Sequence, residues 1–286
     1  MVRGAGDRLF NAAVILILSL CGIAAVFPLL YVVSVSLTPL GEVLRSGSFP
    51  IIPREITFSA YETLLQESGM LRALGVTAFV TVAGTALNML FTVFMAYPLS
   101  RKWLPGRSLF LMMVLFTMLF SGGIIPTYLV VKALGLLDSL WALILPTLIG
   151  SFNVFIVKSF FEQLPEEIFE SAKMDGAGEL RLLAQIALPL SLSVIATISL
   201  FYAVGHWNDF FQAIMYITDR NLFPLQVIVR EILMQTQQPL ENVESMTPTQ
   251  TLQMAAVVLA SLPIIVVYPF LQKYFTKGML LGSIKG

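Results

Sequence analysis

Six long apolar segments alternate with shorter polar segments along the 286 residues of the chain. They cover approximately residues 10–37, 71–99, 108–131, 140–161, 190–217 and 252–274. Each is long enough to cross a bilayer as a helix, which takes about 20 residues with some margin for tilt. Each also contains Gly, Pro, Ser or Thr, which membrane helices tolerate because neighbouring helices satisfy the freed backbone groups. The pattern predicts an all-α integral membrane protein with about six transmembrane helices in a single domain, residues 1–286.

The basic residues in the polar segments predict the orientation of these helices. Three clusters fall on one side of a six-span chain: Arg3 and Arg8, then Arg101, Lys102 and Arg107, then Lys273, Lys277 and Lys285. Lys and Arg are enriched in short cytoplasmic flanks, so we expect both termini to be cytoplasmic. On the opposite side, residues 223–233 read as an amphipathic helix. It either lies on the membrane surface or forms a docking site for a partner.

Composition narrows the class of protein further. The chain is 57% hydrophobic and 12% charged, and its mean hydropathy is +0.85, whereas soluble domains carry about 25% charged residues. Its net charge of zero gives no overall field that would attract nucleic acid or an acidic substrate. One cysteine, Cys21, and one histidine, His206, rule out an intrachain disulfide and a His-rich metal site. The apolar run after the basic N-terminus is longer than a signal-peptide core, so it predicts a retained first span.

One long acidic loop, residues 162–189, departs from the short basic form of the other internal loop. Pro165 suits the first helical position, and Glu166 and Glu167 then complement the positive end of a helix dipole. One apolar flank has helical spacing: Ile168, Phe169 and Ala172. Gly176 supplies a left-handed C-terminal stop, and a second short helix is predicted over residues 179–188. Two amphipathic helices joined by glycine need a partner surface to cover them.

The loop also carries a sequence motif. Residues Glu170-Ser171-Ala172-Lys173-Met174-Asp175-Gly176-Ala177, followed by Ile186-Ala187-Leu188-Pro189, resemble the "EAA" loop of binding-protein-dependent ABC importer permeases. That pattern reads Glu-Ala-Ala, three residues, Gly, and then about nine residues to Ile-x-Leu-Pro. Ser171 departs from it, since Ala is usual at this position. The spacing to Gly176 and Pro189 is intact.

The resemblance covers nearly the whole chain. Residues 121–128 and 201–208 and the terminal segment 277–286 look like the maltose-type carbohydrate importers, in the branch that serves larger oligosaccharides, including alginate oligosaccharides. It implies the type I ABC importer permease fold in a bacterial inner membrane. It also implies a heterodimer with a paralogous permease subunit, two ATP-binding subunits and an extracytoplasmic sugar-binding protein. ATP and Mg²⁺ would be used by the ATPase, and this chain would bind no cofactor.

The resemblance also implies which residues meet the ATPase. In the loop these are Glu170, Ser171, Ala172, Asp175, Gly176 and Ala177. Glu170 would pair with a basic residue of an ATPase cleft, and Gly176 would permit the turn between the two short helices. The cytoplasmic tail, residues 275–286, would reach the same subunits through Lys277, Gly278 and Lys285.

Chemistry within the chain is sparse. The sequence contains no Gly-x-x-x-x-Gly-Lys-Ser/Thr phosphate loop, and no HExxH, Cys-x-x-Cys or Gly-x-Ser-x-Gly motif. We therefore expect a non-catalytic subunit that binds no metal and depends on a separate ATPase chain.

Polar residues within the apolar segments are the candidates for a substrate pathway. Trp207 can cover the C–H face of a sugar ring, and Asn208 can bond its hydroxyls. His206 and Asn153 are further candidates for this pathway. Interhelical hydrogen bonding is the alternative for all four, and it is favoured for Asn153. The run Ser121-Gly122-Gly123 predicts a kink or a helix end, with local unwinding as the alternative.

Three other classes of protein are compatible with a multi-span chain. An ion-coupled secondary transporter predicts paired intramembrane carboxylates or interrupted helices in two related halves, and neither is clear in this sequence. A membrane-embedded enzyme predicts a catalytic cluster on facing spans, and none stands out. A purely structural membrane subunit predicts that the chain co-purifies with a complex and that its deletion causes no defect in transport.

Overall fold

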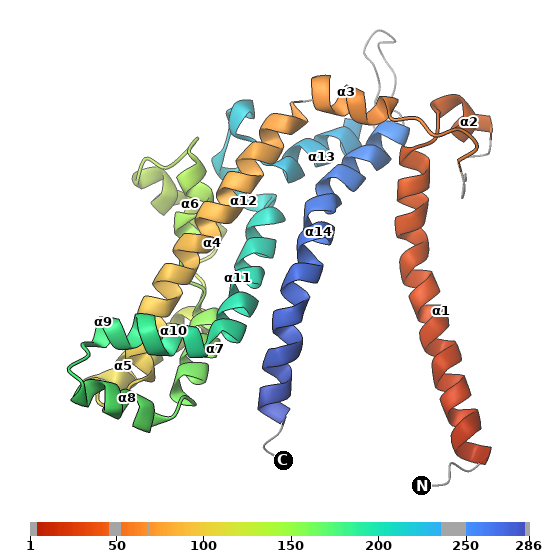
Figure 1. Ribbon diagram of the computed structural model, residues 1–286. Coiled ribbons are helices and arrows are strands. Elements are labelled where there is room, and N and C mark those ends of the chain that lie inside the picture. The colour runs from red at the N-terminus through yellow and green to blue at the C-terminus, as the bar shows by residue number, and fades with distance from the viewer. Residues whose placement is uncertain (1–4, 46–52, 68, 236–249, 284–286) are drawn as a thin grey trace. The chain divides into compact units, whose positions relative to one another are not determined.

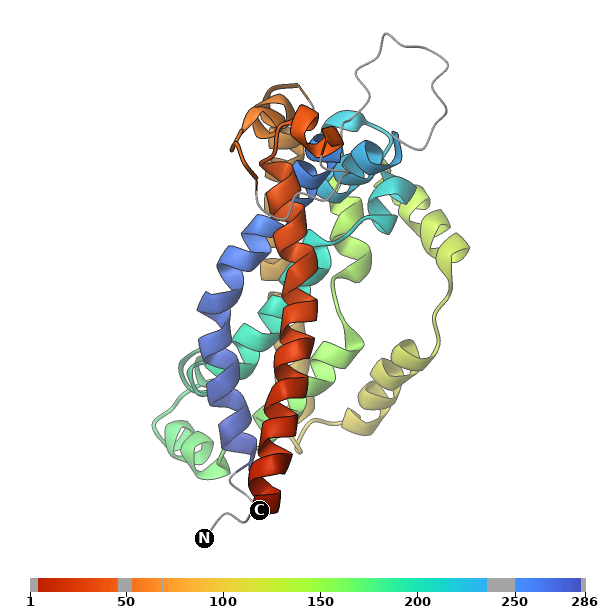
Figure 2. The same ribbon diagram turned by 90° about the vertical axis from the view of Figure 1, so that its right-hand side faces the viewer.

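The computed structural model describes residues 5–45, 53–67, 69–235 and 250–283 (Figure 1, Figure 2). Within these ranges every regular element is a helix, as the sequence predicts for an all-α membrane protein. The chain divides into two compact units. The first comprises residues 1–71 and 228–262, and the second comprises residues 72–227 and 263–286.

The first unit contains a long helix that is apolar around its whole circumference. This is α1 (Ala5–Ser36), in which almost every residue from Phe10 to Leu30 is exposed. A helix that is hydrophobic on all sides needs lipid or another membrane helix around it. Two short helices follow, α2 (Leu40–Arg45) and α3 (Ser59–Glu67). The hydroxyls of Ser36 and Tyr61 lie 2.6 Å apart and tie α3 to the end of α1.

The second unit is organised along α4 (Met70–Ser100). The elements that follow it are α5 (Arg107–Leu119), α6 (Ile124–Ala133), η1 (Leu140–Leu143), η2 (Leu145–Thr147), α7 (Ser151–Glu162), α8 (Glu166–Met174), α9 (Glu179–Leu182), η3 (Leu183–Ala187), α10 (Leu188–Leu190), α11 (Leu192–Trp207), α12 (Phe211–Tyr216) and η4 (Arg220–Leu222). Helices α8 and α9 lie at the C-terminal end of α4, and α6 lies toward its other end (Figure 1). Two further helices, α13 (Leu225–Gln235) and α14 (Gln250–Ser283), contribute residues to both units.

Helices of spanning length take two forms in the described residues. Three are long and apolar enough alone: Phe10–Ser36, Met70–Ser100 and Gln250–Val267. Three more spans arise if two helices joined at a sharp bend count as one, which gives up to six. The bends are 112° between α5 and α6, 52° between η2 and α7, and 85° between α10 and α11.

The bend between α5 and α6 lies at the Ser-Gly-Gly run. Helix α5 ends at Leu119, Phe120 is extended, and α6 begins only at Ile124. Gly123 has a φ of 87°, which favours glycine. The run is therefore a helix end followed by a short non-helical link, which goes further than a kink in a continuous helix.

Candidate functional site

The acidic loop folds into the two short helices that its sequence predicts, and we call α8 and α9 with their joining turn the α8–α9 hairpin. Glu166 and Glu167 form the first turn of α8, where their charges complement the helix dipole. Pro165 was predicted at the first helical position, but it is the N-cap residue, and α8 begins at Glu166. The second helix runs from Glu179 through a π-helical turn, Leu183–Ala187, into α10.

Gly176 ends α8 in the left-handed conformation, with a φ of 80°, as predicted. Its amide donates to the carbonyl of Lys173 at 2.9 Å, and the amide of Ala177 donates to the carbonyl of Ala172 at 3.0 Å. These two bonds define a Schellman motif, in which an apolar contact usually accompanies the turn. Ala172 and Ala177 both pack against the same buried apolar cluster. The glycine therefore fixes the direction in which the chain leaves α8.

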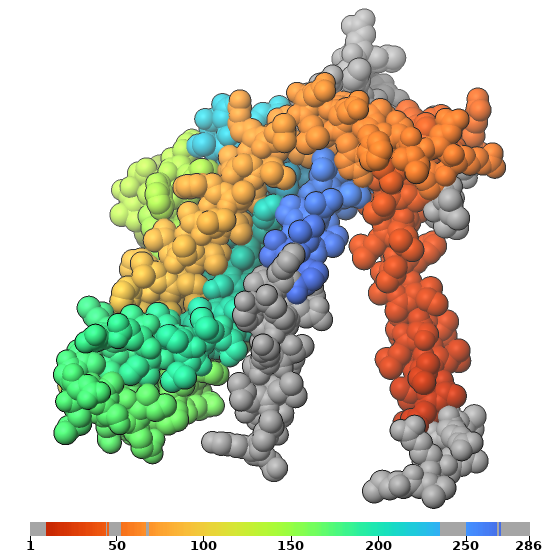
Figure 3. Space-filling model, in the orientation of Figure 1, coloured from red at the N-terminus to blue at the C-terminus, as the bar shows by residue number. Residues whose placement is uncertain are grey.

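The hairpin presents one face inward and one outward. Phe169 is only 3% exposed and packs with Leu182 and Leu183 in the cluster around α7 and α4. On the outer face, Met174 and Leu180 are 89% and 73% exposed. The acidic side chains Glu170 and Asp175 are exposed beside them, as is Ser171. Figure 3 shows the hairpin at the surface of its unit. Exposed apolar side chains rimmed by charge are typical of a protein interaction site.

An arginine joins the hairpin to α4, a contact that was not predicted from the sequence. The guanidinium carbon of Arg101 lies 3.8 Å from the ring centre of Phe169 and 4.6 Å from that of Tyr97. Its Nε and Nη2 atoms are buried and make no hydrogen bond within the described part of the chain. A cation held between two aromatic faces away from water is strongly attracted to both. This stack joins α8 to the last turns of α4.

A second set of polar contacts reinforces this joint. The hydroxyl of Tyr97 donates to Glu179 at 3.0 Å, and Lys173 pairs with Glu179 at 2.9 Å. The ammonium of Lys173 also lies 5.5 Å from the ring centre of Trp103. Burial raises the pKa of the Glu179 carboxyl, but the bonds from Lys173 and Tyr97 outweigh it, so the pKa is lowered overall. Both helices of the hairpin are thus tied to the end of α4.

The polar residues of α11 do not converge on one site. His206 is buried, and its Nε2 lies 3.3 Å from Oδ1 of Asn88, whose amide donates to the carbonyl of Thr147 at 2.9 Å. Asn208 donates to the carbonyl of Val204 in its own helix. For His206 the structure favours interhelical packing, which the sequence offered as the alternative.

Asn153 lies beside Gly150, near the bend between η2 and α7. The amide of Gly150 donates to the hydroxyl of Tyr202 at 3.0 Å, and that hydroxyl lies 2.8 Å from the hydroxyl of Thr92. This bonding connects α4, α7 and α11 through buried polar groups. Asn153 does not line the cavity described next.

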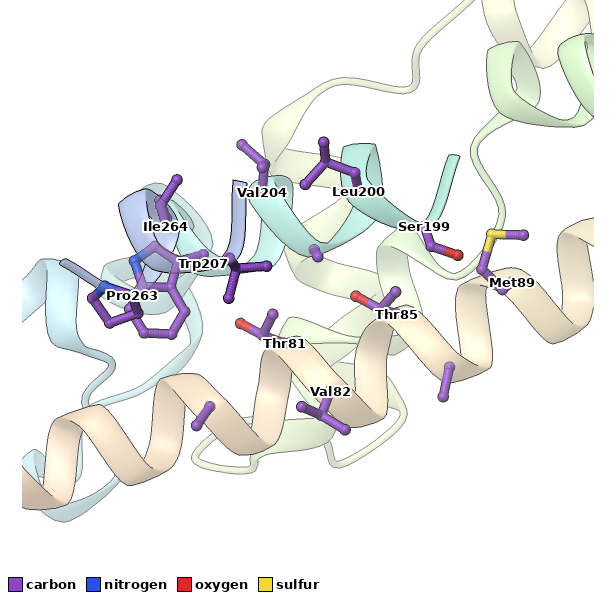
Figure 4. Close-up of a pocket in the computed structure, with 14 residues that line it drawn as sticks. Thr81, Val82, Thr85, Met89, Ser199, Leu200, Val204, Trp207, Pro263 and Ile264 are labelled. Carbon is purple, nitrogen blue, oxygen red and sulfur yellow. The ribbon is translucent and has the colours of Figure 1, made fainter. Parts of the chain in front are cut away.

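Trp207 lines a cavity of about 540 Å³ among α4, α11 and α14 (Figure 4). Most of the wall is apolar, and the exceptions are Thr81, Thr85 and Ser199 together with the indole. The hydroxyl oxygens of Thr81 and Thr85 are buried and have no hydrogen-bond partner among the described residues. A cavity of this size lies within the range of small-molecule sites, which combine apolar walls with a few polar groups. The sequence offered no sign of the two threonines, because threonine is common in membrane helices.

Part of the predicted tail site can be placed. The backbone of Lys277 and Gly278 belongs to α14. Lys285 lies outside the described residues. Among the described residues no group of three or more His, Cys, Asp or Glu side chains could hold a metal ion.

Comparison with known proteins gives a consistent result. Residues 90–281 match the family described as "Binding-protein-dependent transport system inner membrane component". The chain is 50% identical over 283 residues to protein LplC of Bacillus subtilis (strain 168), covering 98% of this chain and 96% of that protein. It is 46% identical over 285 residues to the polygalacturonan/rhamnogalacturonan transport system permease protein YtcP of the same organism, covering 98% and 99%.

A solved structure is similar over almost the same length. It is the crystal structure of a bacterial ABC transporter involved in the import of the acidic polysaccharide alginate. The TM-score is 0.89 at 30% sequence identity, covering 96% of this chain and 99% of the other. At this identity and coverage, the similarity extends to the whole architecture described above.

Proposed function

Because this chain belongs to the family of binding-protein-dependent transport system inner membrane components, we propose that it carries an oligosaccharide through the inner membrane as one permease subunit of an ATP-driven importer. The observation that carries the proposal is the α8–α9 hairpin. It has an exposed apolar and acidic face and is joined to α4 through the Arg101 stack. The chain itself carries no phosphate-binding loop, so the driving ATPase is a separate chain.

The proposed substrate is an acidic oligosaccharide. One relative is named for the transport of polygalacturonan and rhamnogalacturonan, and the similar structure belongs to an importer of alginate. No charged side chain lines the cavity at Trp207 among the described residues. We infer that selection for the negative charge is made by the external binding protein, and that this chain interacts with the hydroxyl and C–H surfaces of the sugar.

The hairpin is the proposed contact with the ATPase. Glu170, Ser171, Asp175 and Gly176 lie at or near its exposed face, while Ala172 and Ala177 hold its turn. Lys277, Gly278 and Lys285 of the tail are proposed to touch the same subunits. The hairpin is linked to the cavity in two ways. The Arg101 stack joins it to α4, and α10 leads directly into α11 across an 85° bend.

These two connections suggest a mechanism. Helices α4 and α11 form two walls of the cavity. If ATP-driven closure of the ATPase dimer moves the hairpin, both walls move with it, and the population shifts between inward-open and outward-open states. The force is therefore transmitted through packed side chains and one continuous length of chain.

The proposed assembly contains four further protein chains. A paralogous permease would complete a heterodimer, two ATP-binding subunits that use ATP and Mg²⁺ would bind the hairpins, and an extracytoplasmic sugar-binding protein would dock on the opposite side, with the bilayer around the whole. Both termini of this chain would be cytoplasmic, as the basic flanks predict. The chain's own role would be non-catalytic, with no bound cofactor.

A direct test is the ATPase activity of the purified assembly with its binding protein and a panel of oligosaccharides. We expect galacturonate or alginate oligosaccharides to stimulate hydrolysis, and neutral oligosaccharides to do so less. If no oligosaccharide stimulates the intact assembly, the proposed function is wrong.

A further inference from the structure

Two threonines of α4 have hydroxyl groups that the fold leaves without a partner. Thr81 and Thr85 lie one helical turn apart, so both face the same direction. Their hydroxyl oxygens are buried and unbonded among the described residues. Threonine in a membrane helix can bond a carbonyl of its own helix, as Thr197 of α11 does with Ser193 at 2.8 Å. The α4 pair does not, although buried hydroxyls without a partner are unfavourable.

Both threonines belong to the wall of the cavity among α4, α11 and α14. Figure 4 shows the oxygens of Thr81 and Thr85 turned toward α11, with Ser199 on α11 toward the Met89 end of the cavity and the Trp207 indole toward the other end. The two oxygens are themselves buried and inaccessible to solvent in this conformation. A small separation of α4 from α11 would expose them to whatever occupies the cavity.

We propose that Thr81 and Thr85, with Ser199 and Trp207, form a sugar-binding subsite that becomes accessible when α4 and α11 separate during transport. The inference rests on the proposed function and adds the residues that would hold the sugar. A sugar unit presents hydroxyls at its edge and C–H groups on its face. Hydroxyl side chains along one wall and an indole at the end complement these two surfaces. The surrounding alanine, valine and leucine side chains form no hydrogen bonds with a sugar. Binding is therefore weak enough for the site to release its ligand.

The unbonded hydroxyls also give the subsite a role in the transport cycle. In the closed conformation, burying these hydroxyls without a hydrogen-bond partner costs free energy. In the open conformation, they form hydrogen bonds with the bound sugar. Replacing them with valine, which has nearly the same shape, removes the cost in the closed state and the bonds in the open state. The same substitution should therefore stabilise the resting transporter and weaken its transport.

The test compares Thr81→Val and Thr85→Val with Thr85→Ser and with Thr197→Val, in the complete transporter. We expect each α4 valine variant to raise the thermal unfolding temperature of the sugar-free complex by about 2 °C. We also expect each to raise the KM for oligosaccharide transport by about five- to tenfold. Thr85→Ser keeps the hydroxyl and should retain transport. Thr197→Val, whose hydroxyl is already bonded, should leave KM unchanged.

Three results would overturn the inference. Lower unfolding temperatures for the α4 valine variants would show that the hydroxyls bond another helix in the assembly. Unchanged KM values would show that no sugar contacts them. A transport defect in Thr85→Ser equal to that in Thr85→Val would assign the effect to packing. Absence of uptake by the unmodified transporter would instead overturn the proposed function.

Discussion

Gly176 and Gly178 lie two residues apart in the hairpin turn, and we expect alanine substitutions at the two positions to change the stability of the turn in opposite directions. A Cβ at either position would meet no atom within 4 Å, so a substitution causes no clash. Gly176 has a φ of 80°, whereas Gly178 has a φ of −75° and a ψ of 164°, which any residue adopts. A left-handed conformation costs an L-residue about 1–2 kcal/mol. An alanine at a compatible site instead stabilises by about 0.4–1 kcal/mol. We therefore expect the turn to be about 2 kcal/mol less stable in Gly176→Ala than in Gly178→Ala.

Hydrogen exchange in the full-length chain measures this difference directly. The amides of residues 176 and 177 are bonded to the carbonyls of Lys173 and Ala172. Their exchange should quicken more than tenfold in Gly176→Ala relative to Gly178→Ala, since 1.4 kcal/mol corresponds to a factor of ten. Gly176→Asn should be intermediate, because Asn tolerates the left-handed region. Equal exchange in the two alanine variants would show that the turn does not depend on the glycine conformation. In the assembled transporter, Gly176→Val should lose sugar-stimulated ATPase activity while Gly178→Ala keeps it.

Three further predictions concern the contacts around α4. Arg101→Met and Phe169→Leu should show a coupling energy of about 1–2 kcal/mol in a double-mutant cycle of unfolding, because the cation–π contact is buried; additive effects would contradict the stack. Gly84→Ala should destabilise the chain by about 1–3 kcal/mol, because its Cβ would lie 2.5 Å from Nε2 of the histidine in α11. Gly205→Ala, which meets nothing, should not destabilise it, and equal unfolding temperatures would refute the close approach. The pKa of Glu179 is lowered in the folded chain, so its stabilisation is full above the unfolded value of about 4.3 and is lost as pH falls through the folded value. Glu179→Gln should flatten stability against pH in that acidic range, and an unchanged profile would count against the Lys173 and Tyr97 contacts.

Features set by neighbouring residues could be predicted from the sequence. The left-handed Gly176 follows from local backbone sterics, and the acidic first turn of α8 follows from the helix dipole. The long apolar segments predict a helical membrane protein, because in lipid a single segment can satisfy all of its backbone hydrogen bonds only as a helix. These predictions hold because each depends on a few consecutive residues or on length alone.

Features that join distant segments could not be predicted. The Arg101 stack needs α8 to fold back onto α4, and in the sequence this arginine served only to predict the orientation of the helices. The pairing of His206 with Asn88 is a contact between α11 and α4, and the sequence can identify each polar residue but not its partner. Trp207 lines the cavity while its neighbour packs elsewhere, because one residue turns about 100° around a helix. The Ser-Gly-Gly run does predict where α5 ends, but the angles of the sharp bends between paired helices depend on tertiary packing.

The driving force for uptake tests the central claim most directly. The chain would be reconstituted in vesicles with its partner permease, the ATPase and the binding protein, and the initial rate of labelled acidic oligosaccharide uptake would be measured. We predict uptake that requires ATP on the side of the hairpin, requires the binding protein on the other side, and is unaffected when the proton gradient is collapsed. Uptake driven by an ion gradient without ATP would contradict the account.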